Sequence, residues 1–468
     1  MTISLNKSDN YISSAQAMAY ALPMISVAFL LGPIVILQGI YAKYFGLSLT
    51  VVGVVILIAR LFDAVTDPLI GYFSDRDQRR TGSRKVFIAS GGLLFIFSSY
   101  FLYTPSENVS AVYFLLWFLA FYFSWTLFEI PHLAWGAELA PDSQSRNRIY
   151  SFRLFGLFFG QLLFYSVPLL PFFSSNEFTP ETLKWSVFAA GLIMLPLLYI
   201  CVSTTPNGHN KSTALNQQQL SVWSLLPTLL SNKPFLLFVG MFSFFGVGLG
   251  MWFTLFFIFA DGYLGLGNKL ALVYLISTSI SILTMGIWPV LAARWGKKTI
   301  WGVAIILIAV AAASTGLLVP GESSFVPLVL IYTLVVLGFA AYSILVPSML
   351  ADIIDYGTWK SGIELSGTYF SVFTLMGKVT MAVGGALGLF IAGGYGFDAA
   401  ASTHTTDAIF GLRFAIAWLP APIVLLALVF VALSPINARR HALIRRCLDA
   451  RVARSYAAES ECKNEPLI

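Results

Sequence analysis

The sequence predicts an all-α, polytopic membrane protein with twelve transmembrane helices in two six-helix bundles. Hydrophobic residues make up 57% of the 468 residues and charged residues only 11%, whereas a soluble globular domain carries about 25% charged residues. Apolar stretches run for about 20 residues, the length that crosses a bilayer, without the two-residue alternation of barrel strands. One long polar connection divides these stretches six and six. A soluble enzyme, a disordered chain and an outer-membrane barrel are therefore excluded.

Twelve apolar segments follow one another along the chain. Each one reaches or approaches the length of about 20 residues that a transmembrane helix needs. The predicted spans are residues 17–40, 48–71, 86–103, 109–136, 149–172, 184–203, 234–260, 269–292, 299–319, 325–349, 367–393 and 411–434.

Polar segments set the predicted organisation of the chain. The longest of them joins the sixth span to the seventh, and a basic segment follows the last span. We expect an N-terminal bundle at residues 1–203, a central cytoplasmic loop at 204–233, a C-terminal bundle at 234–434 and a basic cytoplasmic tail at 435–468.

The distribution of basic residues predicts the orientation in the membrane. If the N-terminus is cytoplasmic, roughly three quarters of the Lys and Arg residues lie in cytoplasmic segments, as the positive-inside rule requires. Basic turns are expected at 74–85 and 293–298, where they either mark topology alone or take part in gating at the inner face. We therefore expect an inner-membrane protein with both termini in the cytoplasm, whose formal charge of +6 orients the chain and does not bind nucleic acid.

Ionisable residues within the predicted spans are the strongest functional signal. A charge at the centre of a bilayer costs at least about 2.5 kcal/mol, so such residues usually serve binding or transport. The alternative is a set of static ion pairs that only fix helix packing. Three positive and three negative residues are present, so an empty cavity can be neutral: Arg60, Arg153 and Lys378 against Asp63, Asp67 and Glu129.

Two acids on the second span predict a cation or proton site. Asp63 and Asp67 are four residues apart and so share one helix face, with Thr66 beside them. Their repulsion is relieved when one acid is protonated or when a cation binds between them. The spacing therefore predicts an ion site and leaves Na⁺ and H⁺ both open.

A second polar face is expected on the fourth span. Glu129 shares it with Thr126 and Trp125, and Pro131 frees a backbone carbonyl there. These oxygens are ligands of the hard type that Na⁺ prefers. At about 1.5 Å per residue, Asp63, Glu129 and Lys378 lie at depths that allow them to meet.

Three stretches resemble the glycoside-pentoside-hexuronide:cation symporter family, a branch of the major facilitator superfamily. They are ARLFDAVTDPLIGYFSDRDQRRTGSRK at 59–85, FEIPHLAWGAELAPDSQSRNRIYSFR at 128–153 and ADIIDYGTWKSGIELSGTYFSVFTLMGK at 351–378. Together with the span count, the resemblance extends over nearly the whole chain. It implies the major facilitator fold, in which two bundles with inverted repeats rock about a central cavity.

The resemblance also implies roles for individual residues. Asp63 and Asp67 match the paired acids of the family's cation site, with Thr66 and Thr126 as further oxygen ligands. Glu129 matches an acid shared between the cation and the sugar, and Arg153 matches an arginine of the cavity. Lys378 matches a lysine that helps to couple the two ligands.

The predicted substrate site departs from that of the galactoside carriers in the family. Those relatives have a carboxylate on the first span, where this chain has Val27 or Ser26. Trp125 and Tyr342 are candidate stacking surfaces for a sugar ring, although ordinary helix packing is an alternative. We expect a substrate less polar than a disaccharide, or an anionic one bound by Arg153 and Lys378.

The expected function is symport of a glycoside, sugar or related small organic solute, coupled to Na⁺ or H⁺, with Na⁺ favoured because oxygen-bearing side chains are numerous. Alternatives are transport of an amphiphile such as a lysolipid, or a non-transporting membrane sensor. No enzymatic activity, cofactor or resident metal is expected, since the four His and three Cys are scattered and no Walker motif occurs. The expected partners are the small-molecule substrate and the lipid bilayer, and the expected state is a monomer.

Overall fold

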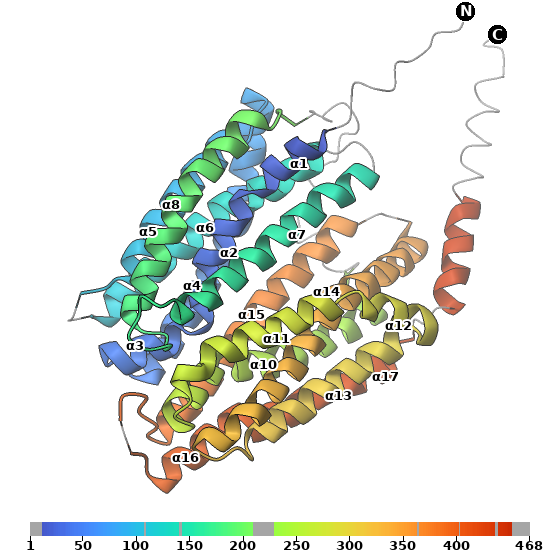
Figure 1. Ribbon diagram of the computed structural model, residues 1–468. Coiled ribbons are helices and arrows are strands. Elements are labelled where there is room, and N and C mark those ends of the chain that lie inside the picture. The colour runs from blue at the N-terminus through green and yellow to red at the C-terminus, as the bar shows by residue number, and fades with distance from the viewer. Residues whose placement is uncertain are drawn as a thin grey trace, which may run out of the picture.

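The computed structural model describes residues 12–106, 109–139, 143–208, 229–362, 365–401, 403–435 and 439–451. Within these ranges the chain forms helices joined by turns (Figure 1). Twelve helical segments are long and apolar enough to cross a membrane. The predicted fold class is confirmed, and the chain is a multi-pass membrane protein.

The first group of helices covers the first half of the chain. Its first span is divided because Pro23 and Pro33 lack the N–H donor that a continuous helix needs. The helices are α1 (Ser14–Ala21), α2 (Pro23–Leu31), η1 (Gly32–Val35), α3 (Leu37–Phe45), α4 (Leu49–Thr81), α5 (Lys85–Tyr103), α6 (Ala111–Leu139), α7 (Ser143–Ser166), η2 (Val167–Leu169) and α8 (Pro180–Thr204).

The second group covers the other half of the chain and is followed by a helix at residues 439–451. Residues 209–228 of the predicted central loop and 452–468 of the predicted tail lie outside the described residues. The helices are α10 (Lys233–Ile258), η3 (Phe259–Tyr263), η4 (Gly267–Lys269), α11 (Leu270–Thr284), α12 (Ile287–Trp295), α13 (Lys297–Thr315), η5 (Glu322–Ser324), α14 (Phe325–Ser361), α15 (Ser366–Gly394), α16 (Thr406–Arg413), η6 (Phe414–Trp418) and α17 (Pro420–Leu433).

Two helices extend well past the ends of their predicted spans. α4 continues to Thr81 and α14 to Ser361, because each first meets a C-terminal stop signal at a glycine with positive φ, Gly82 at 72° and Gly362 at 74°. The predicted basic turn at 74–85 is therefore wrong in extent, since residues 74–81 remain helical. The turn predicted at 293–298 is likewise reduced to Gly296 between α12 and α13.

The two groups of helices, α1–α8 (the N half) and α10–α17 (the C half), lie side by side in Figure 1. We call the side on which α1 begins and α17 ends the terminal side, and the opposite side the far side. The halves meet on the far side, where Lys43 pairs with Asp261 at 2.8 Å and the rings of Tyr165 and Tyr274 stack at 5.0 Å.

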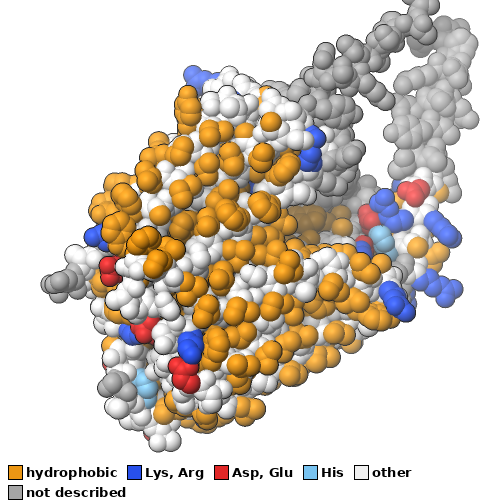
Figure 2. Space-filling model, in the orientation of Figure 1, with side chains coloured by type: hydrophobic (Ala, Val, Ile, Leu, Met, Phe, Trp, Pro, Cys, Tyr) orange, Lys and Arg blue, Asp and Glu red, His pale blue; other side chains and the backbone are white. Residues whose placement is uncertain are grey.

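The membrane-facing surface in Figure 2 is largely hydrophobic, with charged side chains near the ends of the helices. The same view shows a hollow between the halves toward the terminal side. Together with the contacts on the far side, this hollow shows that the protein is open on its terminal side.

Candidate functional site

Asp63 and Asp67 of α4 come together with Lys378 of α15 at the boundary between the two halves. Lys378 Nζ lies 2.8 Å from Asp63 Oδ2 and also forms an ion pair and hydrogen bond with Asp67 Oδ2. The Asp63 side chain is fully buried, and that of Asp67 is 22% exposed. The ammonium group of Lys378 therefore occupies the position between two carboxylates that a transported cation would need.

Thr126 of α6 completes this cluster, which we call the acid site: Asp63, Asp67, Thr126 and Lys378. The Thr126 hydroxyl lies 3.0 Å from Asp63 Oδ1 and 3.1 Å from Asp67 Oδ1, and it donates its proton to these acceptors. Thr66 is buried nearby, but its hydroxyl donates to the backbone carbonyl of Asp63 at 3.3 Å. The structure thus brings Thr126, and not the hydroxyl of Thr66, to the paired carboxylates.

One carboxylate oxygen of the acid site has charged neighbours but no hydrogen bond. Among the described residues, buried Asp63 Oδ2 accepts no hydrogen bond, although it lies 2.8 Å from Lys378 Nζ and 3.7 Å from Arg60 Nη1. A buried acceptor without a hydrogen bond is costly. Cation binding at this oxygen would remove that cost.

Arg60 has a position that the sequence did not predict. Its guanidinium lies 4.2 Å from the centre of the Tyr122 ring, so a cation–π contact supports it beside Asp63. The sequence shows only that Arg60 lies three residues before Asp63, close enough for the two side chains to meet on one helix. The aromatic partner on α6 becomes visible only when the helices are packed.

Glu129 and Arg153 form a second, separate pair within the N half. Glu129 Oε1 accepts a charge-assisted hydrogen bond from Arg153 Nη2, which joins α6 to α7. Glu129 Oε2 and Arg153 Nε are both buried and have no hydrogen-bond partner within the described part of the chain. This pair therefore has one free acceptor and one free donor, the combination that can bind hydroxyl groups of a solute.

Trp125 lies next to the acid site. Lys378 Nζ is 5.6 Å from the centre of its ring, and the buried indole Nε1 has no hydrogen-bond partner among the residues that the structure describes. The tryptophan therefore offers both a stacking face and an unused donor. It links the acid site to the space that a solute would fill.

Tyr342 belongs to a different environment, on α14 of the C half. Its ring stacks with those of Phe242, Phe245 and Phe339 at 5.8, 5.3 and 5.2 Å. Among the described residues the structure gives it no contact with Trp125 or with the acid site. Trp125 on α6 and Tyr342 on α14 thus lie in different halves, as their predicted spans require.

Buried polar contacts at the terminal side fasten the helices of the N half to one another. Arg84 donates to Ser74 Oγ at 2.7 Å, to Asp75 Oδ1 at 2.6 Å and to Glu138 Oε1 at 2.9 Å. Burial by itself lowers the pKa of the Arg84 guanidinium, but the bonds to Glu138 and Asp75 more than offset this and raise the pKa above its ordinary value. We call these four residues the N-half lock.

The far side has an ion pair that sequence reasoning missed. Lys43, at the end of α3, donates to both carboxylate oxygens of Asp261 in η3 at 3.1 and 2.8 Å. Burial lowers the pKa of Lys43, but the hydrogen bond and charge of Asp261 raise it above its usual value overall. Because 218 positions separate these residues, no local pattern could have paired them.

Comparison with known proteins agrees with this architecture. The family described as MFS/sugar transport protein matches residues 13–438. The glucuronide carrier protein homolog of Escherichia coli (strain K12) is 27% identical over 444 residues, which cover 88% of this chain and 90% of that protein. The isoprimeverose transporter of Lactiplantibacillus pentosus is 25% identical over 383 residues, or 79% of this chain and 78% of the relative.

Solved structures show the same fold. The crystal structure of a D-xylose-proton symporter is similar with a TM-score of 0.64 at 17% identity, covering 89% of this chain and 95% of the other.

Proposed function

Because the chain belongs to the MFS/sugar transport protein family, we propose that it is a secondary active transporter. It carries a glycoside, a sugar or a related small organic solute together with a cation across the inner membrane of the cell, with both termini in the cytoplasm. The names of the two relatives, a glucuronide carrier homolog and an isoprimeverose transporter, support this class of substrate. The basic residues at the terminal side support the orientation.

One observation carries the coupling mechanism: Lys378 of the C half lies between Asp63 and Asp67 of the N half. A positive charge is needed there because two carboxylates this close repel each other. In the empty carrier Lys378 supplies that charge. A cation that enters must displace the lysine, so it changes a contact that joins the two halves.

Na⁺ is the coupling ion that this arrangement favours. Three side chains converge with oxygen atoms, those of Asp63, Asp67 and Thr126, and one carboxylate oxygen accepts no hydrogen bond. Hard cations prefer oxygen ligands of this type. A proton needs only a single acid, so the convergence of further oxygens would be unnecessary for H⁺.

Substrate binding is coupled to cation binding through the released lysine. Lys378 already lies against the Trp125 ring, and Trp125 lies one helical turn before Glu129. A displaced ammonium stays within reach of a solute bound at Trp125, Glu129 and Arg153, where it can donate to hydroxyl or carboxylate oxygens. The two ligands must then raise each other's affinity by the same factor.

The test is uptake into energised membrane vesicles with a panel of radiolabelled glycosides, free sugars, hexuronides and a lysophospholipid. We expect accumulation of a glycoside or sugar that saturates with Na⁺ at constant pH and disappears in the Asp67→Asn variant. Substrate-dependent alkalinisation of a Na⁺-free medium would show that H⁺ is the coupling ion. Transport of the lysophospholipid alone would replace the proposed substrate class, and the absence of any gradient-driven uptake would refute the symport.

A further inference from the structure

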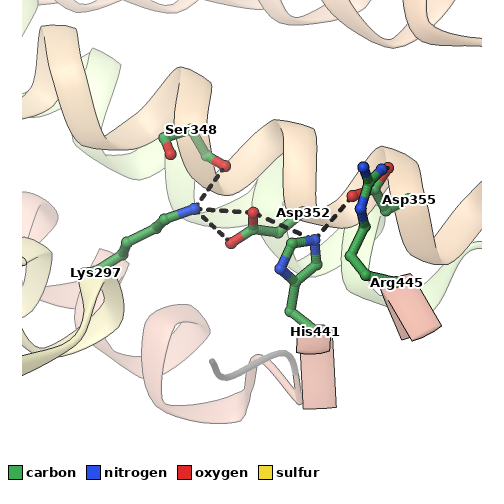
Figure 3. A network of polar contacts seen from close by, with 6 residues as sticks. All are labelled: Lys297, Ser348, Asp352, Asp355, His441 and Arg445. Carbon is green, nitrogen blue, oxygen red and sulfur yellow. Dashed lines mark hydrogen bonds and ion pairs between the residues drawn. The ribbon is translucent and has the colours of Figure 1, made fainter. Parts of the chain in front are cut away.

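The helix at residues 439–451 is docked on the terminal end of α14 (Figure 3). His441 Nε2 lies 2.8 Å from Asp355 Oδ2 and 3.6 Å from Asp352 Oδ1, and Arg445 Nη1 lies 3.3 Å from Asp355 Oδ1. Arg445 of the tail thus pairs with Asp355, and His441 lies beside both acids, at the end of a helix that carries Tyr342 deeper in the bundle.

Two further contacts fix this arrangement. At the last described turn of the tail helix, Arg451 donates to the backbone oxygen of Trp359 at 3.3 Å. From α13, Lys297 Nζ lies 2.8 Å from both carboxylate oxygens of Asp352 and 3.4 Å from the carbonyl oxygen of Ser348 (Figure 3). Asp352 therefore already has a partner within the bundle, whereas the ion-pair partners of Asp355 come from the tail.

The N-half rim of the terminal side, at the end of α4, carries exposed positive charge. Arg76, Arg79 and Arg80 lie on the terminal end of α4 in the N half and are exposed. Within the part of the chain that the structure describes, none of these three arginines forms an ion pair. Any closure of the halves on the terminal side brings this positive rim toward the C half.

We propose that helix 439–451 is a latch that keeps the transporter open on the terminal side. Docked, it pairs Asp355 with Arg445 and His441, so this acid is not free to pair with the arginines of α4. Detached, it exposes Asp355 to the arginines of α4, and that attraction favours closure. The latch rests on the alternating access of the proposed function.

The contacts are weak enough to open and close. The side chains of His441, Arg445 and Asp355 are 25%, 54% and 24% exposed, and pairs with this much solvent contribute little individually. The N-half lock differs in that its arginine is only 7% exposed. The tail is therefore the part of the terminal side that can be released without unfolding a bundle.

A distance measurement on the full-length chain tests the latch. Nitroxide labels at Thr81→Cys and Trp359→Cys, with Cys447 and Cys462 replaced by Ser, report the separation of the two rims by pulsed electron spin resonance in liposomes. The latch variant is His441→Ala, Arg445→Ala and Arg451→Ala. The matched control is Arg439→Ala and Arg446→Ala. It removes two charges from the same helix, at arginines that form no ion pair with any residue that the structure describes.

We expect the latch variant to shift the ratio of closed to open distances upward by roughly two- to fivefold, and the control to leave it unchanged. Adding Asp355→Asn to the latch variant should reverse the shift, because the attraction to the arginines is then lost. An unchanged distribution in the latch variant, or an equal shift in the control, would overturn the proposal. These distances are read without any transported solute, so a failure of the proposed function would not mimic either result.

A label on Cys447 alone tests the docking itself. The side chain is exposed on the tail helix, and in the Cys462→Ser background its nitroxide should be restrained in the parent protein and mobile in the latch variant. Equal mobility in both proteins would show that the three contacts do not hold the tail, and the latch would then be rejected.

Discussion

The two halves of the molecule differ in the charge that they place within the membrane. Five of the six ionisable residues of the predicted sites belong to the N half, and only Lys378 belongs to the C half. Around Tyr342 the C half offers aromatic rings instead. Under the proposed function, the N half holds the cation, and the C half responds to it through a single ammonium group.

The two halves also differ in their polar contacts at the terminal side. The N-half lock surrounds a buried arginine with three acceptors from its own bundle. In the C half, Lys297 is 37% exposed and pairs with Asp352, and the tail supplies partners of Asp355. The terminal-side contacts of the N half therefore come from its own helices. Those of the C half depend on a tail helix that can detach.

The largest effect is expected when the acids of the N half are neutralised. Asp63→Asn or Asp67→Asn removes a charge that the cation needs and leaves Lys378 with one carboxylate fewer, so concentrative uptake should fall to background while expression persists. Asp77→Asn, on the same helix beyond the membrane, is the matched control and should transport normally. Gradient-driven accumulation in either acid variant would show that the N half does not hold the ion.

The next prediction removes the single charge of the C half. Lys378→Ala deletes the ammonium group that joins the halves at the acid site, so cation and substrate should still bind but lose their mutual dependence. The measurement is the affinity for each ligand at zero and saturating concentrations of the other, with Lys360→Ala as a control outside the site. If the coupling factor is unchanged, Lys378 serves only helix packing.

A smaller effect, on stability, should distinguish the terminal ends of the N half and the C half. Arg84→Ala leaves buried Ser74 and partly buried Glu138 without their partner, and we expect a loss of about 1–3 kcal/mol in stability. Lys297→Ala breaks a more exposed pair and should cost less than about 1 kcal/mol. Thermal unfolding of both variants in detergent would measure the contrast, and equal losses would show that the halves are fastened alike.

Much of the fold could be predicted because a membrane imposes a length and an apolar composition on every span. The ends of α4 and α14 were missed, since hydropathy falls at the membrane surface while the helix continues to Gly82 or Gly362. The sequence indicated which charged residues lie within the membrane, but it did not indicate how they divide into separate ion pairs. Spacing placed Glu129 near Asp63, whereas packing gives Glu129 to Arg153 and leaves Thr126 with the acids.

The docking of the tail shows the same limit of sequence reasoning. The run of arginines after the last span is visible in the sequence and predicts a basic tail. Its partners, Asp352 and Asp355, are 86 or more positions away from His441, and only the tertiary arrangement identifies them. The partners of the tail thus could not be found from the sequence, whereas the approach of Lys378 to Asp63 was expected from their depths in the membrane.

The smallest predicted effect lies within the N half and compares two threonines that the sequence treats alike. Thr126 donates to both carboxylates, whereas the Thr66 hydroxyl donates to the backbone of its own helix. Val has nearly the shape of Thr without the hydroxyl, so either substitution removes one oxygen and little volume.

If the structure represents the ligand set of the cation, Thr126→Val should raise the Na⁺ concentration for half-maximal uptake by about five- to tenfold, the loss of one hydrogen-bonding group to a charge. Thr66→Val should change it by less than about twofold. The measurement is the Na⁺ dependence of initial uptake at fixed pH and saturating substrate. A larger effect at Thr66 would mean that its hydroxyl turns toward the cation when Lys378 leaves, so the bound site would include α4 oxygens that the empty site keeps on the backbone.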